Sequence, residues 1–229
     1  GLRKDIEFIS ADIRDPQKVS RACKGVDAVV HLASVNGTEF FYSMPEVVLD
    51  VSTRGMLNII DACLQNGVGE LFFASSSEVY QTPKVVPTGE NVEMVIPDPL
   101  NPRYSYAGGK IISELLLINY GRKYFERAVI FRPHNVYGPE MGMEHVIPQF
   151  ILRMKKLANN KSRLIKFPIQ GTGKETRTFV YIDDFTSGLM TLIDRGKHMQ
   201  IYNIGTSEEV QIKTVAEMVA DYFKKQIII

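Results

Sequence analysis

The sequence predicts an α/β protein with a parallel sheet and helices on both of its faces. Short apolar runs bounded by turn residues alternate with longer helical patterns along the 229 residues, and this alternation is the signature of the class. The runs are continuously apolar, as in strands that are buried on both faces. The segments between them are long enough for crossover connections.

Five apolar runs are predicted as strands of the main sheet. They are Ile6–Ser10, Ala28–Ala33, Glu70–Ser75, Ala128–Arg132 and Ile201–Gly205. Two further strand-like runs, Arg163–Pro168 and Thr176–Ile182, are separated by the turn-forming sequence at residues 170–173.

Six segments have helical periodicity. They are Pro16–Cys23, Pro45–Gln65, Tyr106–Lys123, Val146–Leu157, Asp184–Asp194 and Val215–Phe223. Pro16 and Pro45 suit the first turn of a helix, where a missing N–H leaves no hydrogen bond unmade. Residues 81–102 carry five prolines, so we expect a long surface loop there.

Composition excludes several classes of protein. Lys and Arg number 27 against 26 for Asp and Glu, so no net charge favours a nucleic acid as partner. The two cysteines, Cys23 and Cys63, lie in apolar helical patterns, which argues against a disulfide framework or a zinc site and fits a reducing cytoplasm. We expect no metal. No apolar run approaches the length of about 18 residues that a membrane span requires.

Tyr106 and Lys110 are the first candidate catalytic pair. They open a long helix four residues apart, about one turn, so that the phenol and the ammonium share a face. An adjacent cation favours the phenolate and makes a tyrosine usable as a base. The same spacing also occurs by chance on helix surfaces.

Three serines and a glutamate, residues 75–78, follow a predicted strand directly. Open α/β sheets bind ligands at the carboxyl ends of their strands, where a serine hydroxyl can bond a substrate oxygen. Serines in a row also suit a turn or a helix cap. The order strand, serines, loop and Tyr-x-x-x-Lys helix is what favours a site.

A phosphate-binding turn is missing from the sequence. Dinucleotide-binding folds open with a glycine-rich turn between a strand and a helix. The Gly-x-Gly pairs at residues 67–69 and 171–173 lack a third glycine and that setting. The Walker pattern of a P-loop is absent as well, which argues against a kinase or an ATPase.

Several motifs occur in the order seen in one known family. They are Asp12-Ile13, His31-Leu32-Ala33-Ser34, Gly55-Met56-Leu57-Asn58, Arg132-Pro133-His134-Asn135-Val136-Tyr137-Gly138-Pro139, residues 177–184 and Tyr202-Asn203-Ile204-Gly205. With the Tyr-x-x-x-Lys pair, they make the chain resemble the extended short-chain dehydrogenase/reductases, specifically the NAD-dependent nucleotide-sugar epimerases and dehydratases.

The resemblance implies an incomplete Rossmann-like fold. Residues 1–135 would form a dinucleotide-binding domain without its first βαβ unit. Residues 136–229 would form part of a substrate-binding lobe together with returning Rossmann segments. Ser52 departs from the family pattern, which commonly has an asparagine at that helix position.

The resemblance also implies roles for individual residues. Tyr106 would be the acid/base, Lys110 would hold the nicotinamide ribose and lower the pKa of the phenol, and Ser76 would bond the reacting hydroxyl. The cofactor would be NAD rather than NADP, contacted by Asp12, Ile13, Leu32, Ala33, Ser34, Ser75, Tyr106, Lys110 and Pro133. The substrate contacts would be Ser77, His134, Asn135 and Arg177.

Glu78 bears on the type of reaction. Simple 4-epimerases carry a small or hydroxyl residue there, whereas the 4,6-dehydratases and UDP-glucuronate decarboxylases that Ser76-Ser77-Glu78 resembles carry a glutamate. A carboxylate beside a C4 keto intermediate can take a proton from C5. Epimerase, dehydratase and decarboxylase all stay open, as does a solvated loop carboxylate. A non-catalytic fragment that binds a nucleotide sugar or serves a structural role is the alternative of another class.

The partners implied are a nucleotide-sugar substrate and a second copy of the chain. The homodimer would form through the helices Pro45–Gln65 and Tyr106–Lys123. We expect no nucleic acid and no membrane as partner. The implied setting is cytoplasmic polysaccharide biosynthesis.

Overall fold

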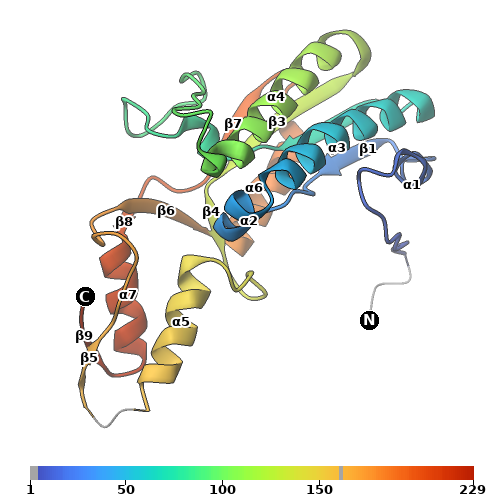
Figure 1. Cartoon of the computed structure of the whole chain (residues 1–229). Coiled ribbons are helices and arrows are strands. Elements are labelled where there is room, and N and C mark those ends of the chain that lie inside the picture. The colour runs from blue at the N-terminus through green and yellow to red at the C-terminus, as the bar shows by residue number, and fades with distance from the viewer. Residues whose placement is uncertain (1–4, 160–161) are drawn as a thin grey trace. The chain divides into compact units, whose positions relative to one another are not determined.

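The computed structural model describes residues 5–159 and 162–229 and is shown in Figure 1. The chain divides into two compact units. The first comprises the residues up to Arg132 together with Thr191–Asn203, and the second comprises Pro133–Met190 and Ile204–Ile229. Each unit has a hydrophobic core of its own.

The first unit is built on a four-stranded sheet with the strand order β1-β2-β3-β7. The strands are β1 (Ala28–His31), β2 (Glu70–Ala74), β3 (Arg127–Pro133) and β7 (Ile201–Ile204). β1 pairs with β2 and β2 with β3 in parallel, with Val30 opposite Phe72 and Phe72 opposite Val129. The predicted α/β class and its parallel sheet are therefore confirmed.

The predicted strand Ile6–Ser10 is wrong. This segment carries no strand pairing, and the side chains of Ile6 and Phe8 are 51% and 75% exposed. A strand forms when a neighbouring strand hydrogen-bonds to its backbone N–H and C=O groups, and no sheet among the described residues includes this segment. Apolar character alone was the signal, and it does not supply that neighbour.

The helices of the first unit begin where the prolines indicated. α1 (Pro16–Ala22) starts after Asp15, whose carboxylate accepts hydrogen bonds from two backbone N–H groups of the first turn. α3 (Pro45–Asn66) ends at Gly67, which takes a left-handed conformation with φ of 72°, the usual role of glycine after a helix. The sequence did not predict the short α2 (Thr38–Ser43).

α4 (Ser105–Tyr124) carries the Tyr-x-x-x-Lys pair and packs closely on α3, as Figure 1 shows. The approach is closest at Gly109, where a Cβ atom would come within 2.7 Å of Ser52 Cβ. The core between these helices and the sheet includes Met56, Ile60, Leu71, Phe73 and Leu117. This packing fixes the axis of α4 beside the carboxyl end of β2.

The proline-rich segment is a loop, as expected. Residues 81–101 form neither helix nor strand and lie between two short 3₁₀ helices. These are η1 (Ser77–Tyr80) and η2 (Pro102–Tyr104). Backbone and side-chain hydrogen bonds from Asn203 tie the loop to β7, because the Asn203 amide groups donate to Glu90 Oε1 and to the Thr88 carbonyl, both at 2.9 Å.

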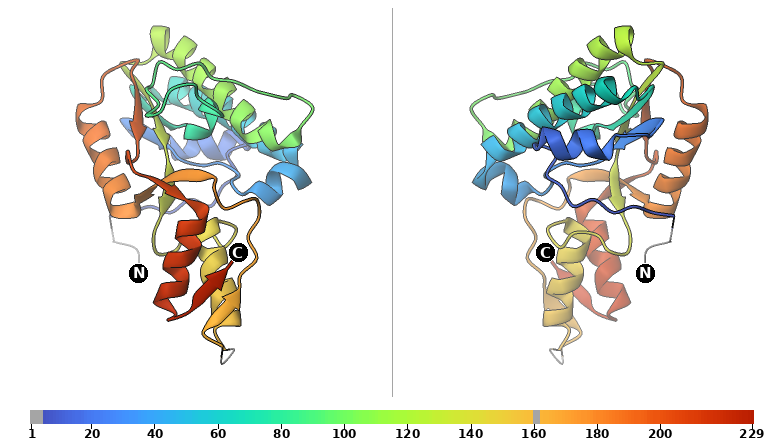
Figure 2. Two further views of the ribbon diagram at one scale, coloured as in Figure 1. Left: turned by 90° about the vertical axis from the view of Figure 1, so that its left-hand side faces the viewer. Right: turned by 90° about the vertical axis from the view of Figure 1, so that its right-hand side faces the viewer.

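The second unit contains two small sheets and three helices among the described residues. Its helices are α5 (Val146–Leu157), α7 (Ile212–Tyr222) and the first part of α6 (Ile182–Arg195). One sheet has the order β4-β6-β8, from β4 (Asn135–Tyr137), β6 (Thr176–Tyr181) and β8 (Glu209–Gln211). The other pairs β5 (Leu164–Lys166) with β9 (Gln226–Ile228). α5 and α7 lie side by side in both views of Figure 2.

The described residues bear on the expectations about membrane-spanning helices, metal-binding groups and disulfides. Within the two described stretches, no helix combines the length and the apolar character needed to cross a membrane. The same residues contain no group of three or more His, Cys, Asp or Glu side chains arranged to hold a metal ion. Cys23 and Cys63 are both free and buried.

Candidate active site

Lys110 lies in the interior at the carboxyl end of β2. Its Nζ atom donates a hydrogen bond to the Ala74 carbonyl at 2.7 Å and lies 4.9 Å from the centre of the Phe73 ring. Only 3% of the residue is exposed. Burial lowers the pKa of the ammonium to about 8, against an opposing effect of Glu114. Lys110 therefore remains largely protonated at neutral pH but gives up its proton more easily than a surface lysine.

Tyr106 lies one turn before Lys110 and is also buried. Its ring stacks on Phe41, with the ring centres 4.9 Å apart and the planes inclined by 16°. Lys110 Nζ is 5.6 Å from the centre of the Tyr106 ring. The Tyr-x-x-x-Lys spacing thus brings the two side chains together as predicted.

The four-residue spacing predicted that Lys110 lowers the pKa of the Tyr106 phenol, but the net pKa of this phenol is raised in the chain as described, and the effect of Lys110 with a bound cofactor stays a prediction. Burial raises this pKa to about 12. The hydroxyls of Ser76 and Ser34 act in the opposite direction, and the charge of Glu78 adds to the increase. Desolvation of a phenolate outweighs the neighbouring cation here, which the four-residue spacing does not reveal.

Ser76 has two functions in the fold. Its Oγ accepts a hydrogen bond from the Glu78 backbone N–H at 3.1 Å and so caps η1. Its hydroxyl also interacts with the phenol of Tyr106. The cap interpretation is therefore confirmed for Ser76, and its role in a ligand site stays a prediction. Ser77, the next residue, is half-buried in η1.

Glu78 forms an ion pair with Arg103. Arg103 Nη1 donates to Glu78 Oε2 at 2.9 Å, and Nη2 donates to Oε1 at 3.0 Å. The side chain of Glu78 is 35% exposed and that of Arg103 is 26% exposed. Glu78 is therefore held in place by a residue of η2, directly before α4, rather than freely solvated.

Arg103 and Phe41 were missed by the sequence analysis. The guanidinium carbon of Arg103 lies 5.2 Å from the centre of the Phe41 ring, and the same ring stacks on Tyr106. The only signal for Arg103 was its place three residues before Tyr106. Phe41 belongs to the unpredicted α2, and no motif marked it.

Ser75 points away from the other serines. Its hydroxyl donates a short hydrogen bond to Glu114 Oε1, and the residue is 3% exposed. Glu114 Oε2 also lies 2.6 Å from Arg132 Nη2, and these two side chains form a buried ion pair. Ser75 is thus part of an internal polar network, and its hydroxyl is not directed at an open surface.

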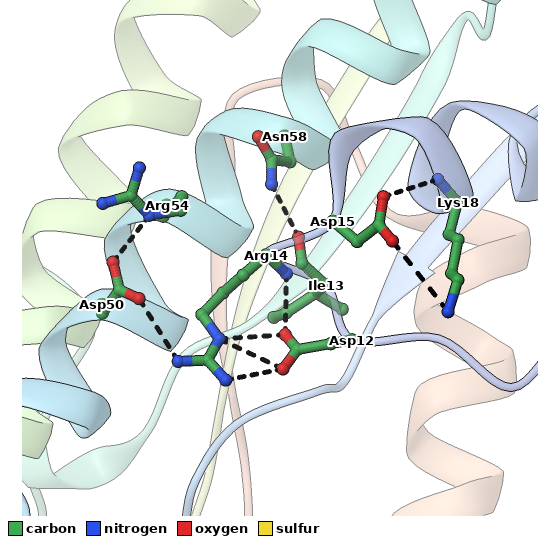
Figure 3. A network of polar contacts seen from close by, with 8 residues as sticks. All are labelled: Asp12, Ile13, Arg14, Asp15, Lys18, Asp50, Arg54 and Asn58. Carbon is green, nitrogen blue, oxygen red and sulfur yellow. Dashed lines mark hydrogen bonds and ion pairs between the residues drawn. The ribbon is translucent and has the colours of Figure 1, made fainter.

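Asp12 and Ile13, which were expected to contact the cofactor, lie in a surface charge network, drawn in Figure 3. The Asp12 carboxylate accepts hydrogen bonds from Arg14 Nε and Nη2 at 2.7–3.1 Å, and these bonds lower its pKa to about 2. Arg14 also reaches Asp50 at 3.4 Å. The carbonyl of Ile13 accepts a hydrogen bond from Asn58 Nδ2 at 2.9 Å.

Leu32, Ala33 and Ser34 follow β1 directly. Leu32 and Ala33 are exposed. The Ser34 Oγ atom is buried and has no geometrically defined hydrogen bond within the described part of the chain, although it lies close enough to affect the Tyr106 phenol. A buried hydroxyl without a partner is rare in folded proteins.

These features fit the nicotinamide end of a dinucleotide. The Ala74 carbonyl takes one of the three N–H bonds of Lys110 Nζ, which leaves donors for a ribose hydroxyl. Ser34 offers a further hydroxyl, and Leu32 and Ala33 leave the end of β1 open. The sequence contains no glycine-rich turn to hold the pyrophosphate.

Three of the four residues expected on the substrate side, His134, Asn135 and Arg177, belong to the second unit, whereas Ser77 belongs to the first. His134 Nδ1 lies 2.7 Å from Thr178 Oγ1, and burial lowers the pKa of this imidazole. Asn135 Nδ2 donates to the Thr178 carbonyl at 2.8 Å. Arg177 is exposed on β6, and Pro133 precedes this group at the end of β3. The structure thus places His134 and Asn135 beside Thr178, a residue of the 177–184 motif to which the sequence analysis assigned no role.

Ser52 is satisfied within its own helix. Its Oγ donates to the Val48 carbonyl at 2.8 Å, and its carbonyl accepts from Ser113 Oγ at 3.1 Å. The bond from Ser113 joins α4 to α3. The departure from the family pattern at this position therefore leaves a packed interface.

Known proteins match most of the chain. Bovine dTDP-D-glucose 4,6-dehydratase is 29% identical over 227 residues, which are 97% of this chain and 60% of the bovine protein. GDP-mannose 3,5-epimerase of Arabidopsis thaliana is 30% identical over 227 residues, 96% of this chain and 58% of that protein. The chain thus spans less than two thirds of the length of these relatives.

Solved structures agree with the parallel-sheet fold. The UDP-glucose 4-epimerase of Thermus thermophilus in complex with NAD is 27% identical, with a TM-score of 0.81 over 99% of this chain and 73% of that one. The dTDP-glucose 4,6-dehydratase of Streptomyces venezuelae with NAD bound is 25% identical, with a TM-score of 0.82 over 99% of this chain and 68% of that one.

A family model agrees with the resemblance found in the sequence motifs. It is described as the NAD dependent epimerase/dehydratase family and matches residues 1–205, including the Tyr-x-x-x-Lys helix and the motif that begins at Arg132. The chain therefore belongs to the NAD dependent epimerase/dehydratase family.

Proposed function

We propose that this protein is a nucleotide-sugar epimerase/dehydratase that transiently oxidises the sugar at C4 with NAD. The observation that carries the proposal is the convergence of Tyr106, Lys110 and Ser76 at the carboxyl end of β2. Family membership and the named activities of the relatives support it. In this proposal residues 1–135 bind the dinucleotide, and residues 136–229 are part of a substrate-binding lobe together with returning Rossmann segments.

Tyr106 acts as the base on the C4 hydroxyl. The Ser76 hydroxyl bonds the same oxygen and orients it. Because burial makes the phenol a weak acid, removal of its proton requires positive charge nearby, which the Lys110 ammonium supplies. A bound nicotinamide supplies the acceptor, and later the donor, of the hydride from the sugar.

Glu78 acts in the step that follows oxidation. A ketone at C4 acidifies the proton on C5, and the Glu78 carboxylate can accept that proton. In a dehydratase the resulting enolate expels the C6 hydroxyl, which leaves as water with the proton from Glu78. Inversion at C5 uses the same first step and returns a proton to the other face.

Other outcomes of the oxidation remain in competition. A simple 4-epimerase needs only rotation of the keto sugar and return of the hydride, and one structural neighbour carries that name. In a UDP-glucuronate decarboxylase the sugar carboxylate leaves as CO₂ and Glu78 has a positioning role. The charge of Glu78 raises the pKa of Tyr106 and so hinders the oxidation step that all these enzymes share. A carboxylate held there by an ion pair is therefore better explained by a role in proton transfer at C5.

The experiment that distinguishes these reactions measures where deuterium from the solvent enters the product. The full-length protein is incubated in D₂O with nucleotide hexoses, and the products are analysed by NMR and mass spectrometry. We expect deuterium at C5 or C6, and we expect Glu78→Gln to abolish it while formation of bound reduced nicotinamide persists. Glu93→Gln, which removes an exposed carboxylate of the loop that follows η1, is the matched control. A C4 epimer without deuterium at those positions establishes the 4-epimerase, and no turnover with any nucleotide sugar establishes the non-catalytic alternative.

The protein forms a homodimer through α3 and α4 in this proposal. Both helices expose apolar side chains, and these are Leu49, Leu64, Ile112, Leu115 and Tyr124, each 36–49% exposed. Sedimentation of the full-length protein and of Leu115→Glu tests this, with a shift to monomer expected for the variant. The cytoplasmic location expected from the two free cysteines is part of the same proposal.

A further inference from the structure

Arg103 forms an ion pair with Glu78, the proposed base for the proton on C5. Its guanidinium donates one hydrogen bond to each carboxylate oxygen of Glu78, at 2.9 and 3.0 Å. A planar guanidinium matches the geometry of a carboxylate in this way, whereas an ammonium binds as a point charge. The pair therefore fixes the plane of the carboxylate as well as its position.

The Arg103 guanidinium also contacts Phe41, the residue on which Tyr106 stacks. It lies 5.2 Å from the centre of the Phe41 ring, and that ring stacks on Tyr106 at 4.9 Å. Arg103 is carried by η2, which leads directly into α4 and thus into Tyr106. Glu78 is thus held by a residue of the segment that directly precedes the helix of Tyr106.

Glu78 has no comparable anchor on its own segment. Its backbone N–H bonds Ser76 Oγ within η1, but its side chain is held from a residue 25 positions later in the chain. A side chain with several rotatable bonds samples many positions unless a partner holds it. A displacement of about 1 Å in a reacting group can lower a rate by roughly 10²-fold.

We propose that Arg103 is a positioning residue that holds the Glu78 carboxylate in place for proton transfer at C5 of the sugar. The proposal rests on the proposed function, because it needs Glu78 to act on C5. Arg103 does not contact the reacting atoms in this assignment. Its effect on the reaction passes through Glu78 alone, and this distinguishes it from a residue that merely stabilises the fold or binds the substrate.

The test compares Arg103→Gln and Arg103→Lys in the full-length protein. We expect Arg103→Gln to lower the rate of deuterium incorporation at C5 by about 10²-fold. Arg103→Lys should restore part of it, because the charge returns without the paired hydrogen bonds. Formation of bound reduced nicotinamide and the affinity for the sugar nucleotide, measured by calorimetry, should change less than about two-fold, since neither needs a positioned Glu78.

Arg127→Gln is the matched control. Arg127 pairs with Glu70 at 2.6 Å, lies 4.9 Å from the centre of the Phe72 ring and is 23% exposed, close to the exposure of Arg103. It stands at the amino ends of β2 and β3, the ends opposite to the candidate site. Loss of this pair should lower stability without changing deuterium incorporation.

A double-mutant cycle decides whether Arg103 acts through Glu78. In a Glu78→Asp background, which keeps a shortened carboxylate and hence a residual rate of C5 exchange, Arg103→Gln should cause a much smaller fractional loss than in the unmodified protein, because two residues that act as a unit are not additive. An equal fractional loss in both backgrounds overturns the proposal. So does a large loss of sugar-nucleotide affinity in Arg103→Gln, which identifies the residue as a substrate ligand.

The failure of this proposal can be told apart from failure of the proposed function. If the unmodified protein shows no deuterium at C5 or C6, the assignment of Glu78 fails and the Arg103 proposal fails with it. If the unmodified protein exchanges C5, and Glu78→Gln abolishes the exchange while Arg103→Gln leaves it intact, only the role of Arg103 is overturned.

Discussion

The Arg132 guanidinium and the Glu114 carboxylate form an ion pair that is almost completely buried. Arg132 Nη2 lies 2.6 Å from Glu114 Oε2, and the two side chains are 2% and 0% exposed. Arg132 also donates to Tyr80 Oη at 2.8 Å and to the Glu90 carbonyl at 3.0 Å. The pair therefore joins α4 and β3 to the proline-rich loop behind the candidate site.

Arg132→Met should destabilise the protein by about 3–5 kcal/mol, because it leaves the charge of Glu114 buried without a partner. Arg132→Met combined with Glu114→Leu should recover much of this loss. The measurement is the free energy of unfolding in urea. Arg195→Met is the control, since Arg195 and its partner Asp194 are 81% and 73% exposed and such pairs contribute about 0–1 kcal/mol.

The fold could be predicted from the sequence wherever periodicity and end signals acted together. The helix Val146–Leu157 was predicted with the bounds that the structure shows, and the long helix after Pro45 was predicted to within one residue at its end. α2 was missed because six residues form too few turns for a period to show. β4, β8 and β9 were also missed, because a strand of three residues is too short for its pattern to show.

The candidate site was predictable only where its residues are close in sequence. Tyr106 and Lys110 share a helix face because they are four residues apart, and the structure brings them together. Arg103 and Glu78 are 25 residues apart, so only the folded loop brings them into contact. The pKa of Tyr106 depends on burial, which a local motif does not encode.

Gly109→Ala should lower the free energy of unfolding by about 1–3 kcal/mol, the usual range for an overpacked interface. A Cβ atom there would lie 2.7 Å from both Cβ and Oγ of Ser52 on α3. Gly108→Ala is the matched control, because the nearest atom to its Cβ would be Ile96 Cδ1 at 3.8 Å. That variant should gain up to about 1 kcal/mol from helix propensity. Equal effects of the two substitutions would contradict the close packing of α3 and α4.

Tyr106→Phe should lower kcat by about 10²–10⁴-fold, the usual contribution of a general acid–base group. The phenyl ring keeps its stacking on Phe41, so the affinity for the sugar nucleotide should stay unchanged in calorimetry. Tyr104→Phe, a half-buried tyrosine at the start of the same helix, is the control and should retain activity. Full turnover of Tyr106→Phe would exclude this phenol from proton transfer.

Lys110→Met should change the way stability depends on pH. The ordinary pKa of the lysine ammonium, 10.5, applies to the unfolded chain, and burial lowers it to about 8 in the folded chain. Between these values the unfolded state binds more protons, so the stability of the unmodified protein rises with pH across this window. Methionine fills the same space without a charge and has no such dependence.

The quantity to measure is the difference in the free energy of unfolding between the unmodified protein and Lys110→Met, by urea titration at several pH values from about 7 to 10, the range in which the two pKa values make the proton counts differ. As the pH rises through this range, we expect the free energy of unfolding of the unmodified protein to increase relative to that of the variant by up to about 3 kcal/mol. Each pKa unit corresponds to about 1.4 kcal/mol. The other titrating groups are common to both proteins and cancel in the difference. A difference that stays constant would show that the Lys110 ammonium is not desolvated in the folded state. It would thereby remove the buried charge on which the proposed activation of Tyr106 depends.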